Sequence, residues 1–425
     1  MSKRLLSECL EIEKNAIDPR HHPDEIFYYY TLPNFDDGKI VEIAKGSSIE
    51  SNKFIVNRGS VLISKLNPRI KRVWMVVNDG NLRSIASTEF LVAVAKNFVD
   101  ADYLFYVLQS DNVHRKLECE SVGTTNSHTR YKPKALYAIE VEFPAQSIQG
   151  KIARILQTID RAIEKTEALI DKYQQIKAGL MHDLFTRGIG PDGQLRPPRK
   201  QAPELYQETP IGWVPKEWNV KVLSDACDWF SGGTPSKSRE DWWQGDIPWL
   251  SPKDMKKFEL SDTEHHLTNI AAISGSRVVP AETVFIVVRG MILAHSFPVV
   301  ISSKEFAFNQ DVKAIIARGE LANRYLAYWF VSNKNLFLKK TTESTHGTKR
   351  FDLRDIYAVT IGIPSVAEQD KIVNCLDTLE SMINSTISQR EKLQLQKNGL
   401  MHDLLTGKVP VQAEEPEAEP EAAHV

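Results

Sequence analysis

A long internal repeat constrains this chain more than any other feature of its sequence. Residues 179–186 read GLMHDLFT and residues 399–406 read GLMHDLLT, an offset of 220 positions. The same offset holds without a gap from Pro144 and Pro364 to these two ends, and 18 of the 43 aligned pairs are identical. Self-similarity over so long a stretch indicates a duplicated domain rather than a short-period solenoid. The chain is therefore expected to fold as two copies of one unit of about 220 residues.

Weaker similarity extends the repeat upstream of these segments. Arg130 matches Arg350, and YLFYVL at 103 matches YLAYWF at 325. The helical segments of the two copies match well, whereas the upstream segments match only in scattered framework positions. This contrast indicates that the two upstream segments diverged after the duplication and that each has its own ligand.

Each copy begins with about 140 residues in which short β-branched and aromatic runs alternate with turn residues. KFIVNRGSVLISKL at 53–66 and FLVAVA at 90–95 are typical of short strands. The YLFYVLQS and YLAYWFVS segments are expected to be short helices among them. We therefore expect the α+β class, with two globular mixed α/β domains that each contain a twisted sheet.

Each copy ends in a long amphipathic helix, flanked by a proline before it and a glycine after it. Roughly 40 residues at 1.5 Å each make a rod of about 60 Å, and its apolar stripe needs a partner in water. The simplest partner is the other copy, which predicts two long antiparallel coiled-coil helices and an internal pseudo-two-fold repeat. The stripe of the first helix comprises Ile148, Ile152, Ile155, Ile159, Ile163, Ile170, Tyr173, Leu180 and Leu184.

These patterns divide the chain into six parts. They are a first globular domain (1–143), a central helix (144–187), a connector (188–218), a second globular domain (219–363), a C-terminal helix (364–407) and an acidic tail (408–425). The connector is rich in Gly, Pro and polar residues and is expected to be irregular and on the surface. Its end, IGWVPKEW, is expected to pack at the entrance to the second domain. The tail combines low hydrophobicity with dense negative charge, which predicts disorder.

Composition excludes several classes of protein. No run reaches the roughly 18 apolar residues of a membrane span, and the N-terminus has no apolar signal-peptide core, so a cytoplasmic protein without a membrane partner is expected. The four cysteines are scattered without CxxC spacing, which argues against a metal site or a disulfide framework. The formal net charge of −2 neither supports nor excludes nucleic acid, because binding depends on local patches.

The usual signatures of catalysis are missing from the sequence. GGTPSKS at 232–238 has Ser236 where a phosphate loop requires glycine, and there is no GxGxxG, GxSxG or HExxH. The adjacent His182 and Asp183 would point about 100° apart on a helix and would not form a dyad. We expect no catalytic residue, and interpret the GLMHDL ends as helix-terminal packing motifs or as docking sites for one partner bound twice. The docking candidates are Leu180, Met181, His182, Leu184, Leu400, Met401, His402 and Leu404.

Two polar segments at equivalent places have the composition of a surface that binds nucleic acid. SVGTTNSHTRYK at 121–132 and TTESTHGTKRFD at 341–352 combine hydroxyls, an amide or histidine, glycine and basic residues. Arg and Lys can contact phosphate or guanine, Asn can read adenine, and Ser or Thr can serve either purpose. A basic cluster at 64–72 follows a predicted strand, and Arg289 lies near the matching place in the second copy. A solvated turn is the alternative for each segment. The DNA-binding candidates are Lys65, Arg69, Lys71, Arg72, Thr125, Asn126, Ser127, His128, Arg130, Lys237, Lys253, Arg289, Thr345, His346, Thr348, Lys349 and Arg350.

Four longer stretches carry a resemblance to a known family. They read FSGGTPSKSREDWWQGDIPWLSPKDM at 230–255, IPSVAEQDKIV at 363–373, FTRGIGPDGQLRPP at 185–198 and ELYQETPIGWVPKEW at 204–218. Through them nearly the whole chain resembles the specificity subunit of type I restriction–modification enzymes. The first domain departs from the pattern, since it lacks the GGTPS and Trp-Trp elements of the second.

The resemblance implies a non-catalytic subunit with two target-recognition domains, each reading one half of an interrupted, asymmetric DNA sequence. The implied partners are double-stranded DNA, two modification (methyltransferase) subunits and the restriction (translocase and nuclease) subunits. S-adenosylmethionine, ATP and Mg would belong to those partners, with no cofactor in this chain. The long helices would act as spacer and docking surface. The alternative is a pseudo-symmetric coiled-coil scaffold whose globular parts bind protein rather than DNA.

Overall fold

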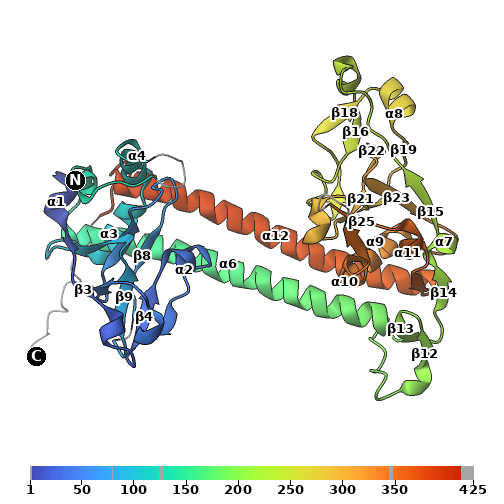
Figure 1. The fold of residues 1–425 in the computed structure, drawn as a ribbon, viewed down its shortest axis with the longest axis horizontal. Coiled ribbons are helices and arrows are strands. Elements are labelled where there is room, and N and C mark those ends of the chain that lie inside the picture. Colours follow the sequence, from blue (N-terminus) through green and yellow to red (C-terminus); the bar gives the residue numbers. More distant parts are fainter. Residues whose placement is uncertain (1, 79, 124–128, 344–347, 413–425) are drawn as a thin grey trace, which may run out of the picture. The chain divides into compact units, whose positions relative to one another are not determined.

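The chain, in a computed structural model that describes residues 2–78, 80–123, 129–343 and 348–412, forms two compact units. The first unit contains the described residues up to 168 together with those from 387 onward, and the second contains residues 169–386. Two long helices, α6 (Gln146–Thr186) and α12 (Val366–Leu405), each contribute one half to each unit (Figure 1). Each unit therefore combines a globular part with a segment of both helices. Most of the predicted acidic tail, from residue 413 onward, lies outside the described residues.

The globular part of the first unit mixes short strands with short helices, as the α+β prediction requires. Its strands are β1 (Ser2–Leu5), β2 (Leu10–Glu13), β3 (Ala16–Ile17), β4 (Ile26–Tyr30), β5 (Glu42–Lys45), β6 (Lys53–Val56), β7 (Val61–Ser64), β8 (Val73–Met75), β9 (Arg83–Ser87), β10 (Phe90–Ala95) and β11 (Glu140–Phe143). Its short helices are α1 (Leu6–Cys9), α2 (Leu32–Asp36), α3 (Ala101–Gln109), α4 (Asp111–Cys119) and α5 (Pro133–Tyr137).

A central antiparallel sheet of the first unit, in the order β2-β10-β7-β8, is buried on both faces. Side chains alternate along β10, so Leu91 and Ala93 pack with helix α3 while Phe90 and Val92 pack toward the other side. That other side is covered by a second sheet in the order β3-β6-β9-β4-β5, in which β4 and β9 run parallel. Burial on both faces explains why FLVAVA is a continuous apolar run rather than an alternating one.

The second unit repeats this framework with its own elements. Its strands are β12 (Tyr206–Thr209), β13 (Gly212–Pro215), β14 (Asn219–Val222), β15 (Cys227–Ser231), β16 (Ile247–Leu250), β17 (Glu259–Leu260), β18 (His265–Leu267), β19 (Val278–Val279), β20 (Val284–Val287), β21 (Val299–Ser302), β22 (Phe306–Phe308), β23 (Val312–Ala317), β24 (Thr341–Glu343), β25 (Lys349–Phe351) and β26 (Thr360–Ile363). Its short helices are α7 (Leu223–Ala226), α8 (Asn269–Gly275), α9 (Asn323–Ser332), α10 (Lys334–Leu338) and α11 (Leu353–Tyr357).

The order of the central sheet shows the duplication directly. The order β15-β23-β20-β21-β17 follows that of the first unit through β21 and then adds β17, and β14 pairs with β26 as β1 pairs with β11. The second sheet of this unit, in the order β18-β16-β22-β19, has a different strand order from its counterpart. The framework is thus retained while the outer sheet has diverged, in line with the weak upstream similarity of the two sequences.

A repeated glutamine fastens each long helix to its globular part. Gln149 accepts a hydrogen bond from the Asp100 amide at 2.8 Å, and Gln369 accepts one from the Ala322 amide at 2.9 Å. Both glutamine amides donate to the carbonyl of the proline five residues before them. Both side chains are almost fully buried and satisfied, so this identity in the repeat reflects how the helix is attached.

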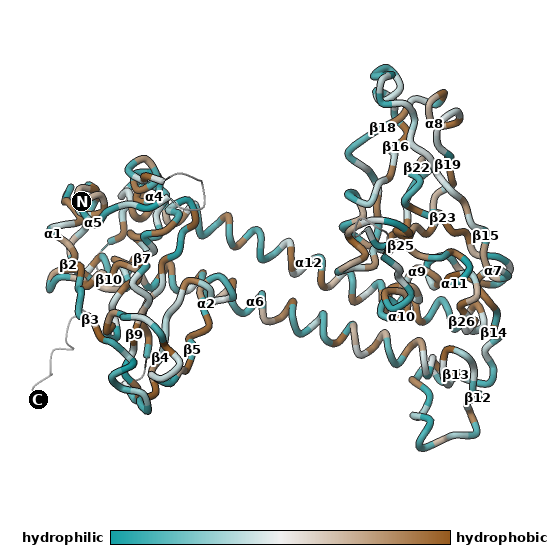
Figure 2. Tube along the Cα trace, in the orientation of Figure 1, coloured by the Kyte–Doolittle hydropathy of each residue, from teal (hydrophilic) through white to brown (hydrophobic). Residues whose placement is uncertain are grey.

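The two long helices run antiparallel, as predicted, and an equivalent ion pair joins them in each unit. Lys397 of α12 binds Asp160 of α6 at 2.6 Å in the first unit, and Lys177 of α6 binds Glu380 of α12 in the second. The repeat offset relates each residue of one pair to its counterpart in the other. Figure 2 shows teal and brown alternating along both helices, as expected for amphipathic rods. The predicted stripe needs one correction, because Ile155 is 39% exposed whereas its neighbour Leu156 is fully buried.

The duplicated GLMHDL sequences are the C-terminal turns of these helices. Thr186 and Thr406 each donate their hydroxyl to the carbonyl of the histidine four residues earlier, and Gly188 and Gly407 follow with φ of 64° and 70°. A glycine with positive φ ends a helix without strain. The two copies of this sequence therefore end their helices in the same way.

The connector is more ordered than the sequence suggested, and the expectation of an irregular surface segment is wrong for its second half. Strands β12 and β13 form a hairpin there. Arg196 is buried, and its guanidinium makes a two-point ion pair with Glu368 of α12 at 2.5 and 3.0 Å. Trp218 packs into the core of the second unit, as expected for IGWVPKEW, and donates its indole N–H to Glu368. A buried charge needs such partners, which is why this segment is fixed.

Candidate nucleic-acid interface

The two polar segments predicted to bind nucleic acid are equivalent hairpins. In the first unit, Val122 and Arg130 exchange both backbone hydrogen bonds, at 2.9 and 3.0 Å. In the second, β24 pairs with β25, and Thr342 faces Arg350. The paired strands are described, and Arg130 and Arg350 occupy equivalent places. Six candidates between these strands lie outside the described residues, namely Thr125, Asn126, Ser127, His128, Thr345 and His346.

Each hairpin is joined to the loop that follows a buried strand. Leu66, after β7, forms an antiparallel bridge with Arg130, and Arg289, after β20, forms one with Arg350. The next residue in each loop, Asn67 or Gly290, has positive φ and donates its backbone N–H to the hairpin, at 2.8 Å and 3.0 Å. The structure therefore brings together the segments that the sequence singled out separately, and does so in the same way twice.

A carboxylate completes this arrangement in each unit. Glu89 directly precedes β10 and Asp311 directly precedes β23, and their carbonyls accept backbone N–H bonds from Lys65 and Val288 at 2.9 and 2.8 Å. The Glu89 carboxylate binds Arg130 at 2.9 Å, and the Asp311 carboxylate binds Arg289 at 2.6 Å. Both arginine side chains remain more than half exposed. Neither acid was predicted from the sequence, because an acid before a strand is an ordinary turn residue.

The other basic candidates of the first unit have distinct environments. Arg72 is mostly buried and held by Asp36 at 2.7 Å, which makes it part of the framework. Lys71 pairs with Asp111 at the start of α4, and exposed Arg69 donates to the side chain of Asn67 at 3.4 Å. Burial lowers the pKa of Lys65, with the neighbouring Glu89 carboxylate acting against that shift. Of this set, Arg69 and Lys71 are the exposed cations.

In the second unit, Lys237 and Lys253 line a cavity of about 530 Å³ that has polar side chains in its wall. Thr234 donates its hydroxyl to the side-chain carbonyl of Gln310 at 2.6 Å, and Gln310 and Asp311 both line the cavity. The preceding glycines have a packing role, since a Cβ at Gly232 would lie 2.1 Å from the Phe308 carbonyl oxygen. The cavity thus adjoins the Arg289–Asp311 pair.

Thr348 and Lys349 complete the second hairpin. Lys349 pairs with Glu343 at 2.9 Å across the hairpin, and Thr348 is partly exposed beside it. The Arg350 side chain is exposed and makes no ion pair within the described part of the chain. The two arginines of this bridge therefore differ, since Arg289 makes an ion pair with a carboxylate and Arg350 makes none within the described residues.

A basic groove of about 870 Å³ lies between α4 and α5 of the first unit, and most of it was not predicted from the sequence. Five cationic side chains and one carboxylate, Glu120, line it, and the strongly exposed Val122 stands at its rim. An excess of positive charge in a groove beside the hairpin suits an anionic polymer. The KPK sequence at 132–134 is the feature from which this groove could have been predicted. The cations are Arg115, Lys116, Arg130, Lys132 and Lys134.

The docking candidates divide into buried and exposed residues. Met181, Leu184 and Leu404 are buried in the cores of their own units, and Leu180, Leu400 and Met401 are partly buried against them. These side chains pack within the chain, whereas His182 and His402 are exposed. Asp183 and Asp403 pair with the next basic residue along the chain, Arg187 or Lys408, and not with a histidine.

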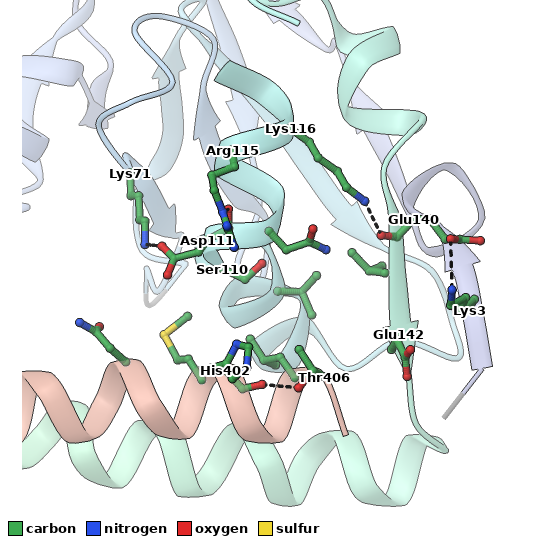
Figure 3. Close-up of a pocket in the computed structure, with 16 residues that line it drawn as sticks. Lys3, Lys71, Ser110, Asp111, Arg115, Lys116, Glu140, Glu142, His402 and Thr406 are labelled. Carbon is green, nitrogen blue, oxygen red and sulfur yellow. Dashed lines mark hydrogen bonds and ion pairs between the residues drawn. The ribbon is translucent and has the colours of Figure 1, made fainter. Parts of the chain in front are cut away.

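A cavity of about 400 Å³ in the first unit adjoins the end of α12 (Figure 3). His402 and Thr406 line it from the helix, and Lys71, Asp111 and Glu140 line it from the globular part. Opposite charges are paired across its wall, including Lys71 with Asp111 and Lys3 with Glu140. The helix end therefore presents a mixed polar surface rather than an apolar one.

In the described ranges, no group of three or more His, Cys, Asp or Glu side chains is arranged to hold a metal ion. Nor does any helix of these ranges combine the length and apolarity needed to cross a membrane.

Comparison with known proteins relates both halves of the chain to one family. The chain is 30% identical over 241 residues to the specificity subunit of the type I restriction enzyme EcoR124I/EcoR124II of Escherichia coli, which covers 56% of this chain and 53% of that protein. The match thus spans about half the length of this relative. The chain is 22% identical over 420 residues to the MjaVIII specificity subunit of Methanocaldococcus jannaschii, which covers 94% of this chain and 90% of the relative.

Solved structures show the same fold. A chain from a study of complex assembly and conformational transition in the type I R-M system has a TM-score of 0.56 at 17% identity, covering 96% of this chain and 98% of that one. The type I restriction–modification S subunit from M. genitalium has a TM-score of 0.54 at 13% identity, covering 95% and 96%. The family model for the type I restriction modification DNA specificity domain matches residues 2–174 and again residues 215–397. The chain therefore belongs to this family and carries its domain twice.

Proposed function

We propose that this chain is the DNA sequence-recognition subunit of a type I restriction–modification complex, and that each globular part reads one half of a two-part, asymmetric target. The observation that carries the proposal is the repeated loop arrangement, in which a hairpin is bridged at Arg130 or Arg350 to the loop after a buried strand. This backbone frame of hairpin and bridged loop carries different side chains in the two units. Two related frames with different side chains suit two different half-sites.

Recognition would divide between phosphates and bases. Exposed cations such as Arg69, Lys132, Lys134 and Arg350 would neutralise backbone phosphates, which provides most of the affinity and makes it strongly dependent on salt. Side chains at the hairpins and at the polar cavity would contact base edges, where hydrogen bonds distinguish one sequence from another. The first kind of contact fixes the position of the domain on DNA and the second sets the sequence.

The chain itself would carry out no chemistry. Two modification subunits would bind at the two helix ends, where His182 and His402 are exposed at equivalent places, and would supply adenine methylation from S-adenosylmethionine. Restriction subunits would supply ATP- and Mg-dependent translocation and cleavage. The long helices would act as the spacer between the half-sites, and the whole complex would act on DNA in the cytoplasm.

Mapping methylated adenines tests this proposal. DNA from cells that express the chain with its modification subunit is sequenced by a single-molecule method that detects N6-methyladenine. A two-part motif is expected, and replacement of residues 1–143 should change only one of its halves. If the complex assembles but no motif is found, and purified chain binds protein partners without competition from duplex DNA, the scaffold alternative replaces this proposal.

A further inference from the structure

The carboxylates of Glu89 and Asp311 occupy one repeated position beside the hairpins. Each acid directly precedes the second strand in the order of its sheet, β10 or β23, and each carbonyl accepts a backbone N–H from the residue that follows the neighbouring strand, Lys65 or Val288. The upstream halves of the two copies have diverged in sequence and in the outer sheet, yet an acid stays at this position. A fixed backbone position therefore presents a carboxylate to the surface in both units.

The partner of the carboxylate is an arginine in both units, but the arginine comes from a different segment. Glu89 Oε1 accepts from Arg130 Nη2 at 2.9 Å, and Arg130 belongs to the hairpin. Asp311 Oδ1 accepts from Arg289 Nε at 2.6 Å, and Arg289 belongs to the loop after β20. The backbone arrangement is repeated in the two units, whereas the arginine comes from a different segment in each. This difference points to a role of the two carboxylate–arginine pairs in distinguishing the two half-sites.

A carboxylate at a DNA-facing surface has a cost, because it repels phosphates and lowers affinity for every sequence. It has a use only if it orders a neighbouring group. A guanidinium has five N–H donors in a planar fork. When a carboxylate occupies one nitrogen or one edge of that fork, the remaining N–H groups point in a fixed direction and can still bind two acceptors.

We propose that Glu89 and Asp311 are positioning residues that set sequence specificity, by holding Arg130 and Arg289 in the orientation that reads a guanine in each half-site. The inference rests on the proposed function. Guanine is the expected base because its N7 and O6 acceptors match two parallel N–H groups of arginine. A held arginine loses less conformational freedom on binding, and it cannot turn freely toward phosphates of a wrong sequence. Arg350, which makes no ion pair within the described residues, is left to contact phosphate.

The test compares the methylation motifs of Glu89→Gln and Asp311→Asn with that of the wild-type chain, each expressed with its modification subunit. Glu89→Gln should relax one G·C position in one half of the motif, and Asp311→Asn should relax one G·C position in the other half. The ratio of methylation at correct sites to that at sites changed in this position should fall about tenfold, the order expected when one two-point base contact is removed. Total methylation should persist, because a negative charge has been removed rather than a positive one.

A matched control removes the same charge without touching an arginine. Glu50→Gln, at an exposed position of the first unit that does not line the basic groove, should leave both halves of the motif unchanged. Thermal unfolding of each purified chain shows whether the variants fold. An unchanged motif in folded Glu89→Gln and Asp311→Asn overturns the inference, as does relaxation of both halves by either variant alone. A wild-type complex that assembles but yields no two-part motif overturns the proposed function and this inference together.

Discussion

Arg289 and Arg350 face each other across an antiparallel bridge that joins the loop after β20 to the hairpin of β24 and β25. Leu66 and Arg130 form the same bridge in the first unit. The backbone geometry is shared, but only the hairpin side of the bridge, Arg130 or Arg350, carries the same residue type in both copies. Under the proposed function, this common backbone arrangement with different side chains would be the physical basis for reading two different sequences.

Replacing Arg350 by alanine should weaken DNA binding to all sequences by a similar factor. Its exposed side chain makes no ion pair within the described ranges, so we expect a phosphate contact, and its removal should lower the slope of log K against log salt by roughly one. Lys349→Ala should have a smaller effect, because Lys349 already pairs with Glu343. Fluorescence anisotropy with cognate and one-base-changed duplexes at several salt concentrations measures both quantities. Loss of discrimination in Arg350→Ala would instead assign it to a base.

The basic groove of the first unit should contribute to salt dependence. The double variant Lys132→Gln, Lys134→Gln should reduce the salt slope by up to roughly two, at about 0.9 for each phosphate that is no longer neutralised. The half-site sequence should not change. Lys200→Gln with Lys216→Gln, two exposed lysines of the connector, is the control for net charge. If both double variants give the same slope, the groove does not track the DNA backbone.

The distance between half-sites should be fixed. We expect roughly 10 base pairs from centre to centre, one turn of DNA, so that both domains meet the same face of the duplex. A gel-shift series with spacers lengthened or shortened by about three base pairs rotates one half-site by roughly a third of a turn and should lower affinity strongly. Equal affinity for all spacers would rule out a rigid spacer.

Glu368 should be essential to the stability of the second unit. It is buried and accepts hydrogen bonds from Arg196, from the Ile189 amide at 2.8 Å and from Trp218. Glu368→Gln would leave the Arg196 guanidinium without its buried counter-charge, at a cost of about 3–5 kcal/mol in the free energy of unfolding. The exposed partner of the same arginine provides the control, since Glu217→Gln should cost at most about 1 kcal/mol. Denaturant unfolding followed by circular dichroism compares the two variants. Similar losses in the free energy of unfolding would contradict the essential role of Glu368.

His114 should make the first unit less stable in acid. Its ring Nδ1 donates to the Pro68 carbonyl at 3.0 Å beneath the 64–72 loop, and burial lowers the pKa of the ring below its usual value of 6.5. Below about pH 6.5 the unfolded chain therefore binds more protons than the folded chain, so stability falls as the pH decreases. The fall in Tm between about pH 7.5 and about pH 5.5 should be smaller in His114→Gln than in the wild type. His21→Gln, at an exposed position, should behave as the wild type does.

The sequence by itself determined the duplication, the α+β class and the long helices. These follow from patterns that are local or repeated: the period of apolar residues, the flanking prolines and glycines, and the constant offset of 220. It also singled out the polar segments at 121–132 and 341–352 and the basic cluster at 64–72, because polar residues recurred at equivalent places. Local pattern is enough for such features, since hydrogen bonding and side-chain alternation act over a few residues.

Only the tertiary structure decided which of these residues meet. Glu89 and Arg130 lie 41 positions apart and Arg196 and Glu368 lie 172 apart, so no local pattern could reveal either pair. The connector was expected to be irregular because of its Gly, Pro and polar content. Its order depends on the buried Arg196, whose charge is satisfied by Glu368 of a helix distant in the sequence. The GLMHDL ends left packing and docking open as interpretations, and only the tertiary structure shows that the globular parts cover their apolar side chains while His182 and His402 stay exposed. Burial and pairing depend on the packing of segments distant in sequence, which is the information that composition and periodicity do not contain.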